Sequence, residues 1–178
     1  MIRVHHLENS RSQRVLWLLE ELGLPYEVVR YARDPKTMLA PPALRAIHPL
    51  GKSPVVEADG EVLAESGYIL ETLAERHGAG TLAPVHGTPA FARYRYWLHY
   101  AEGSAMPPLL LALVFSKVRQ APLLVRPIAN AIADKVMSGF VGPQLRTHFD
   151  YLEAELGRAE WFAGEAFSAA DIVMSFPV

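Results

Sequence analysis

The first 77 residues alternate short apolar runs with segments that have helical spacing. Ile2–Leu7 and Tyr26–Tyr31 are short and rich in apolar or β-branched residues, which favours β-strands. Between them, apolar residues recur three and four positions apart, as one face of an amphipathic helix requires: Val15, Leu18, Leu19 and Leu22. Gly23 and Pro25 end this helix. The pattern therefore predicts a strand, a helix and a second strand.

A hairpin and another helix follow in the same half of the chain. A loop with a short helix at 43–47 leads to two β-like runs, 54–57 and 61–63, which flank an Asp-Gly pair. That pair favours a tight hairpin turn. A helical segment at 67–76 then ends at Gly78. The order β-α-β followed by β-β-α predicts a small mixed four-stranded sheet with helices on its faces.

The second half of the chain contains no convincing strand pattern. Thr88 is suited to cap a helix whose first position is Pro89. Apolar and aromatic positions with helical spacing continue through three further segments: 109–119, 128–137 and 143–156. We therefore predict an all-α bundle for this half.

The composition between the two halves indicates a linker. Glycine, threonine and proline are concentrated at 78–88. The predicted fold class is α/β followed by all-α, with an α/β domain at 1–79, a linker at 80–88 and a helical bundle domain at 89–178.

Ser168 and Asp171 have the spacing of a capping box that starts another helix. Asp171 is accordingly interpreted as a helix-start residue and not as a catalytic acid. The sequence ends at Val178, before this helix is complete, so we expect the natural protein to continue.

Composition and charge exclude several classes of function. There is no cysteine, which excludes disulfides, thiolate metal sites and a protein thiol nucleophile. The near-balanced net charge of −2 gives no reason to expect nucleic acid or a membrane as the main partner. The N-terminus lacks the features of a signal peptide, and the aliphatic run at 109–115 is too short to span a bilayer. We therefore expect a cytoplasmic protein.

Taken together, these features resemble the cytosolic glutathione transferases. The segment HLENSRSQRVLWLLEEL, residues 6–22, is similar to the first strand, loop and helix of bacterial and fungal members. The linker, the all-α second half and the Ser-Ala-Ala-Asp box agree with that family in order. The resemblance implies a thioredoxin-like first domain that binds glutathione as co-substrate, and a homodimeric enzyme without a metal.

The resemblance implies that the catalytic group lies in the Asn-Ser-Arg-Ser loop. A free thiol has a pKa of about 8.5, so the enzyme must stabilise the thiolate of glutathione near neutral pH. A hydroxyl donor and the N-terminus of the first helix can supply this. No Tyr or Cys occupies the loop, and we favour Ser10, with Asn9 and Ser12 as alternatives. Each of the three could instead cap the helix that starts near Gln13.

The remaining implied contacts to glutathione come from two segments. In the family, the proline at the position of Pro54 is cis, which turns the backbone of Ser53 outward to pair with the cysteinyl backbone. Lys52 stands where members bind the glycine carboxylate. Glu65 and Ser66 suit the ammonium and the α-carboxylate of the γ-glutamyl group. From the residues alone, Glu65-Ser66 is an ordinary helix start and Pro54 the first residue of an edge strand.

Other residue clusters favour structural interpretations. His5 and His6 are neighbours on a strand, so their side chains point to opposite faces and cannot bind one metal ion. The aromatic residues of 94–100 are expected to divide between the core and the wall of an apolar substrate pocket. The apolar stretch at 106–115 could line the same pocket, but core is the more common role of such a stretch.

The predicted function is conjugation of the glutathione thiolate to small hydrophobic electrophiles in a pocket between the domains. A glutathione-dependent peroxidase or disulfide reductase would need the same bound thiolate. A non-catalytic interaction module with the same fold is the alternative from another class.

Overall fold

The computed structural model describes all 178 residues. The N-terminal region contains a four-stranded sheet with the strand order β2-β1-β3-β4. β1 and β2 are parallel, whereas β1 pairs with β3 and β3 with β4 in antiparallel register. The strands are β1 (Ile2–Leu7), β2 (Tyr26–Tyr31), β3 (Val55–Ala58) and β4 (Glu61–Ala64). The predicted mixed four-stranded sheet is confirmed.

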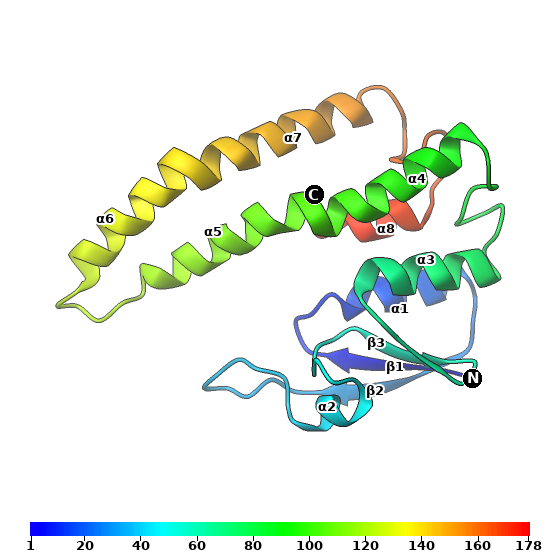
Figure 1. Ribbon diagram of the computed structural model, residues 1–178, viewed down its shortest axis with the longest axis horizontal. Coiled ribbons are helices and arrows are strands. Elements are labelled where there is room, and N and C mark those ends of the chain that lie inside the picture. The colour runs from blue at the N-terminus through cyan, green and yellow to red at the C-terminus, as the bar shows by residue number, and fades with distance from the viewer.

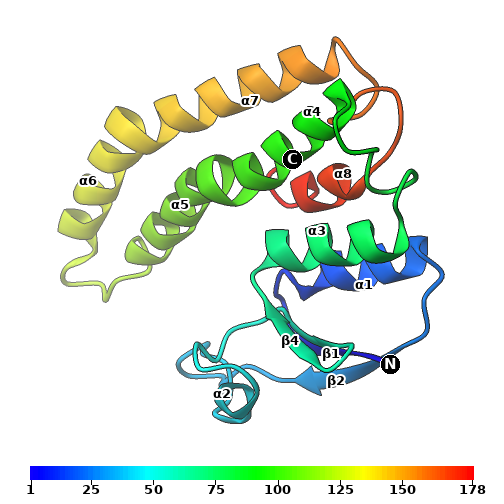
Figure 2. The ribbon, with the colours of Figure 1, turned by 45° about the vertical axis from the view of Figure 1, so that its right-hand side comes forward.

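Three helices accompany the sheet: α1 (Ser12–Glu21), α2 (Ala43–Ile47) and α3 (Ser66–His77). α1 and α3 lie side by side on one face of the sheet, and α2 lies toward the opposite side (Figures 1 and 2). The face of α1 that carries Val15, Leu18 and Leu19 is fully buried, as its spacing predicted. One crossover and one hairpin therefore generate the sheet, as expected from the order of the elements.

The rest of the chain is helical, which confirms the second part of the predicted fold class. The helices are α4 (Pro89–Tyr100), α5 (Met106–Val118), α6 (Arg126–Val136), α7 (Gly142–Leu156) and α8 (Ala169–Met174). α4 and α8 lie over the layer formed by α1 and α3, while α5, α6 and the start of α7 form an arm that extends beyond the sheet (Figure 1). The predicted boundaries of a linker at 80–88 stay a prediction.

Two π-helical turns join helices that the sequence pattern left separate. Ala101–Ala105 continues α4 into α5, and Met137–Val141 continues α6 into α7. In a π-helical turn, each backbone N–H donates to the carbonyl five residues earlier, where an α-helix uses the carbonyl four residues earlier. The N–H of Met106, for example, donates to the carbonyl of Ala101. Prolines follow both turns within two residues. A proline cannot donate to the carbonyl four residues earlier, and a π turn is one way in which a helix accommodates this.

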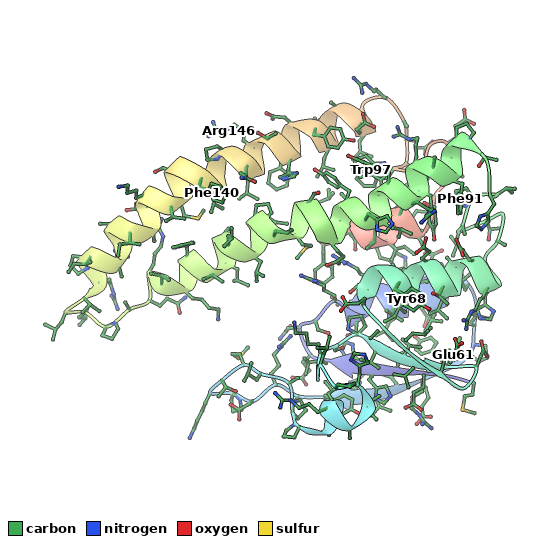
Figure 3. The ribbon with its side chains drawn as sticks, viewed as in Figure 1. Glu61, Tyr68, Phe91, Trp97, Phe140 and Arg146 are labelled. Carbon is green, nitrogen blue, oxygen red and sulfur yellow. The ribbon has the colours of Figure 1, made fainter.

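A single hydrophobic core connects the sheet layer with α4 and α8. Trp97 lies on α4 (Figure 3) and is buried. Its ring stacks on that of Tyr151 of α7, with centroids 5.5 Å apart. α8 begins with the predicted capping box. The Asp171 carboxylate accepts from the backbone N–H of Ser168 at 2.8 Å and from that of Phe162 at 2.9 Å. Asp171 is thus a helix-start residue, as interpreted from the sequence.

The apolar stretch at 106–115 is not core in this structure. Pro108 is the one buried residue of α5, and Leu110 and Leu113 are more than half exposed. The stretch lacks a periodic polar face, so its composition could not indicate which side meets solvent. No helix is long and apolar enough to cross a bilayer.

Candidate functional site

A cavity of about 120 Å³ lies where the loop before β3 meets the start of α3. Five of the eight residues proposed from the sequence line this cavity: Lys52, Ser53, Pro54, Glu65 and Ser66. Arg11, from the loop that precedes α1, lines it as well. The fold therefore brings three separate segments of the chain together around one polar cavity.

The Ser53–Pro54 peptide bond is cis, as the resemblance implied. The side chain of Ser53 ties this segment to β1: its Oγ donates to the carbonyl of His5 at 2.9 Å and accepts from the N–H of Leu7 at 3.3 Å. These bonds fix the position of the segment relative to the end of β1. Ser53 and Pro54 both face the cavity.

Glu65 and Ser66 stand at the N-terminus of α3. Glu65 is the N-cap residue and has a φ of 73°, in a region that residues other than glycine rarely adopt. Its side chain makes no capping hydrogen bond, so the carboxylate is exposed at the cavity. Ser66 is the first helical residue and is buried. An ordinary N-cap would use its side chain to bond the helix, and Glu65 does not.

The three loop candidates differ in accessibility, and none of them lines the cavity itself. The Asn9 residue is exposed and has a φ of 50°. Ser12 is fully buried, so it can reach a ligand only through another group. Ser10 is 8% exposed, and its Oγ lies 3.4 Å from the Oγ of Ser53, which does line the cavity. Ser10 is thus the hydroxyl of the loop nearest to the site.

The hydroxyl of Ser10 also supports the start of α1. The helix begins at Ser12, one residue earlier than expected, and its N-cap residue, Arg11, makes no side-chain capping bond. Instead the Ser10 Oγ accepts from the N–H of Ser12 at 3.3 Å. The capping interpretation and the catalytic one are therefore compatible for this residue.

Arg33 holds the loop in place, and the sequence analysis did not identify it. Its guanidinium donates to the carbonyls of Glu8 at 2.9 Å, Asn9 at 3.1 Å and Met38 at 2.9 Å. The acceptors are backbone carbonyls, which every residue has, so no pattern of residue types could have indicated these bonds. The interaction fixes the backbone on which Asn9 and Ser10 stand.

A partly buried ion cluster joins the loop to the first π-helical turn. The carboxylate of Glu102 accepts from Arg11 at 2.6 Å and from Arg14. The side chain of Arg14 is fully buried; its guanidinium lies 4.4 Å from the ring centre of Phe176. Burial lowers the pKa of Arg14, and the charge of Glu102 opposes that shift. The sequence analysis missed this cluster because its members lie about 90 positions apart.

The histidines of β1 face opposite sides of the sheet, as predicted. His5 is buried and bonds Tyr31 Oη through Nδ1 at 2.9 Å and Glu57 through Nε2 at 2.7 Å. His6 bonds the Oγ of Ser12 through Nδ1 at 2.8 Å. No group of three or more histidine and carboxylate side chains is arranged to hold a metal ion.

The aromatic residues of α4 belong mainly to the core. Tyr94, Trp97 and Tyr100 are buried, while Tyr96 is nearly half exposed and accepts from Tyr151 Oη at 3.0 Å. Burial raises the pKa of Tyr100 to about 12 and that of Tyr94 further. Only Tyr96 is therefore available to contact a ligand from this set.

The chain is similar to known proteins over its whole length. The profile of the glutathione S-transferase N-terminal domain matches residues 10–76. Glutathione S-transferase 3 of Schizosaccharomyces pombe is 38% identical over the whole of this chain, which covers 73% of that protein. The chain belongs to the glutathione S-transferase family. The match extends across both the sheet and the helical region, so the thioredoxin-like N-terminal domain and the helical region after it are those of this family.

Two further glutathione S-transferases support this assignment, and a third shares the fold. Glutathione S-transferase 1 of Saccharomyces cerevisiae is 35% identical over the whole chain, which covers 80% of that glutathione S-transferase. A crystal structure of a glutathione S-transferase from Actinobacillus pleuropneumoniae is 35% identical, with a TM-score of 0.75 over 99% of this chain and 76% of the other. A sphingomonad glutathione S-transferase, solved in complex with glutathione, shares the fold at 24% identity and a TM-score of 0.71.

Proposed function

We propose that this glutathione S-transferase conjugates the thiolate of glutathione to small apolar electrophiles. The observation that carries the proposal is the cavity in which Lys52, Ser53, Glu65 and Ser66 converge from separate segments. Glutathione presents two carboxylates, one ammonium and a peptide backbone, and this cavity offers a counterpart for each.

Each group in the cavity has a proposed role. The Glu65 carboxylate pairs with the ammonium of the γ-glutamyl group. The Ser66 hydroxyl and the free N–H groups of the first turn of α3 bind the adjacent α-carboxylate. Lys52 binds the glycine carboxylate. The backbone of Ser53, next to the cis bond to Pro54, pairs with the cysteinyl backbone like an added strand.

The thiolate is proposed to accept a hydrogen bond from the Ser10 hydroxyl. That hydroxyl is the most favourably placed of the loop candidates, because it lies beside Ser53 and keeps some exposure. The positive end of α1 adds to the stabilisation. Asn9 is the alternative donor on the exposed side of the loop, and Ser12 acts only behind Ser10 because it is fully buried.

The exposed apolar side chains of α5 support an apolar second substrate. Leu110 and Leu113 are available there to contact a hydrophobic compound. The same helix continues from the π turn that carries Glu102, which binds Arg11 at the cavity. We propose that the electrophile binds on this side of the glutathione thiolate.

Calorimetric titration of the protein with glutathione tests the binding roles. Ser66→Ala should weaken binding by roughly 1.5–3 kcal/mol, because it removes a donor to a charged carboxylate. Ser138→Ala is a matched control, since Ser138 bonds the carbonyl of Asp134 on an exposed helix. Absence of binding by the wild-type protein at millimolar glutathione would support a non-catalytic interaction module instead.

Turnover assays test the catalytic role. Ser10→Ala should leave glutathione binding largely intact and slow conjugation to an aryl halide, since its hydroxyl acts chiefly on the thiolate. An unchanged rate would exclude Ser10 and leave Asn9 as the next candidate. Organic hydroperoxides and mixed disulfides, assayed beside the aryl halide, separate a transferase from a peroxidase or reductase.

We also propose that the protein is a homodimer, with the domain division at residues 80–88. Large apolar side chains are exposed farther along the arm, on α6 and in the segment before it: Leu123, Leu124, Ile128 and Ile132. Exposed apolar surface of this extent is typical of protein interfaces. Light scattering at micromolar concentration should give twice the mass of the chain; a monomer mass would contradict the proposal.

A further inference from the structure

A chain of hydrogen bonds runs from the cavity wall to a histidine that the proposed function does not use. The Oγ atoms of Ser10 and Ser12 lie 2.7 Å apart, and Ser12 Oγ lies 2.8 Å from the Nδ1 of His6. At the other end, the Ser10 Oγ lies 3.4 Å from the Oγ of Ser53. Both short contacts are within the range of good hydrogen bonds, and both serines are buried.

The direction of these bonds is restricted because each serine has one hydrogen to donate. The hydrogen of Ser53 goes to the carbonyl of His5, so Ser53 cannot donate to Ser10. The backbone N–H of Ser12 occupies one of the two acceptor positions of the Ser10 Oγ. The O–H bonds of Ser10 and Ser12 can therefore both point toward His6 or both point away from it. Their direction depends on whether the Nδ1 of His6 accepts a hydrogen bond from Ser12 or donates one to it.

We propose that His6 is a positioning residue for the thiolate and, through Ser12 and Ser10, the first acceptor of the thiol proton. This inference rests on the proposed binding of glutathione next to Ser10. His6 does not line the cavity, and its imidazole bonds Ser12, so it acts only through the two serines.

The proton transfer balances in atoms and charge. At the start, Ser10 donates to Ser12, Ser12 donates to the unprotonated Nδ1 of His6, and the Ser10 Oγ accepts from the thiol S–H. The Ser10 Oγ then takes the thiol proton, while each hydroxyl passes its own hydrogen one step along to Nδ1. A neutral thiol and a neutral imidazole become a thiolate and an imidazolium, which afterwards releases its proton to water.

After this proton transfer, every hydrogen bond in the chain is donated in the direction of the thiolate sulfur. The Nδ1–H of His6 now donates to Ser12, and Ser12 donates to Ser10. The Ser10 Oγ has both acceptor positions filled, and its O–H donates to the thiolate sulfur. Hydrogen bonds to a charged acceptor are about twice as strong as neutral ones, so the thiolate is favoured in this arrangement.

The surroundings of His6 contain few other charged groups. On β2, Arg30 is paired with His6 in register, so both side chains lie on the face of the sheet that α1 covers. On α1, the guanidinium of Arg14 is bound by Glu102. On β3, Glu57 lies on the opposite face and binds His5.

The proposal is tested by the pKa of glutathione bound to the protein, followed through the ultraviolet absorbance of the thiolate during a pH titration. His6→Ala should raise this pKa by about one unit, a tenfold loss of thiolate below the pKa. Glutathione affinity should stay unchanged when it is measured well below this pKa, where the bound thiol is protonated. Ser12→Ala interrupts the same chain inside a buried site and should cause a similar rise. Because the two residues act in series, the double variant should show no further rise.

Two further variants separate this role from a structural one. His6→Asn keeps an N–H donor near the position of Nδ1 and should restore most of the thiolate. His99→Asn, at an exposed position on α4, should leave the pKa unchanged. A pKa that stays at the wild-type value in both His6→Ala and Ser12→Ala would overturn the proposal, and so would additive effects in the double variant. Failure of the wild-type protein to bind glutathione in calorimetry would instead refute the proposed function.

Discussion

The ion pair between the fully buried Arg14 and the partly buried Glu102 permits a quantitative prediction for stability. In Glu102→Ala, the guanidinium of Arg14 keeps its fully buried position but loses its counter-ion. Removing one partner of a buried ion pair costs about 3–5 kcal/mol. The Glu102 side chain is 26% exposed, so water can partly replace it, and we expect the lower end, about 3 kcal/mol. With a urea m-value of about 2 kcal/mol/M, the midpoint of unfolding should fall by about 1.5 M.

Glu155 provides a matched control for this measurement. Its carboxylate also accepts from two arginines, Arg93 and Arg158, but these are 40% and 74% exposed and can return to water. Glu155→Ala should therefore cost about 1 kcal/mol. The double variant Arg14→Met, Glu102→Leu should recover most of the loss, because no charge is left buried. A loss for Glu102→Ala no greater than that of Glu155→Ala would refute the reasoning.

Three further predictions concern the backbone, the pH and a helix cap. Glu65 has a φ of 73°, which glycine adopts without strain, so Glu65→Gly should be about 1–2 kcal/mol more stable than Glu65→Ala in urea unfolding. Both variants should lose affinity for glutathione, and equal stabilities would show that the backbone at this position is not strained. Burial raises the pKa of both Tyr100 (to about 12) and Tyr94, so stability should be complete below pH 10 and decline above it. Tyrosinate absorbance and circular dichroism can follow this together, and tyrosinate formation by all seven tyrosines near pH 10 without unfolding would contradict it. Asp171→Ala should lower the free energy of unfolding by about 2 kcal/mol, because the backbone N–H groups of Ser168 and Phe162 lose their acceptor. A loss below about 0.5 kcal/mol, the least that a helix cap contributes, would show that water replaces the carboxylate.

Local patterns were sufficient for the elements of the sheet and for the capping box. The first two of the four predicted strands, Ile2–Leu7 and Tyr26–Tyr31, have the bounds that the structure shows, because their apolar residues pack against α1 or the neighbouring strand. Asp171 could be interpreted from sequence because its partner lies only three residues away. Interactions that lie within one turn or one hairpin leave a signal in the order of residues.

Long-range interactions left no such signal. Glu102 looks like any helical carboxylate until the fold brings it against Arg11 and Arg14. Residues 106–115 are exposed because α5 belongs to the arm that extends beyond the sheet. The uniformly apolar composition of this segment does not indicate that position. The position of His6 could be predicted in part: strand alternation places it on the face opposite His5, but only the structure shows that it lies against Ser12.

The π-helical turn at Ala101–Ala105 has a geometric consequence for the arm. A π turn is equivalent to one extra residue in an α-helix, and one residue corresponds to a rotation of about 100° and a rise of about 1.5 Å. Deleting Gly103, whose surroundings are open, would let the turn revert to α-helix. Every side chain of α5 would then turn about the axis by that angle, and Pro108 would leave the buried face. The one extra residue of the π turn thus determines which side of α5 is buried and which side is exposed to other molecules.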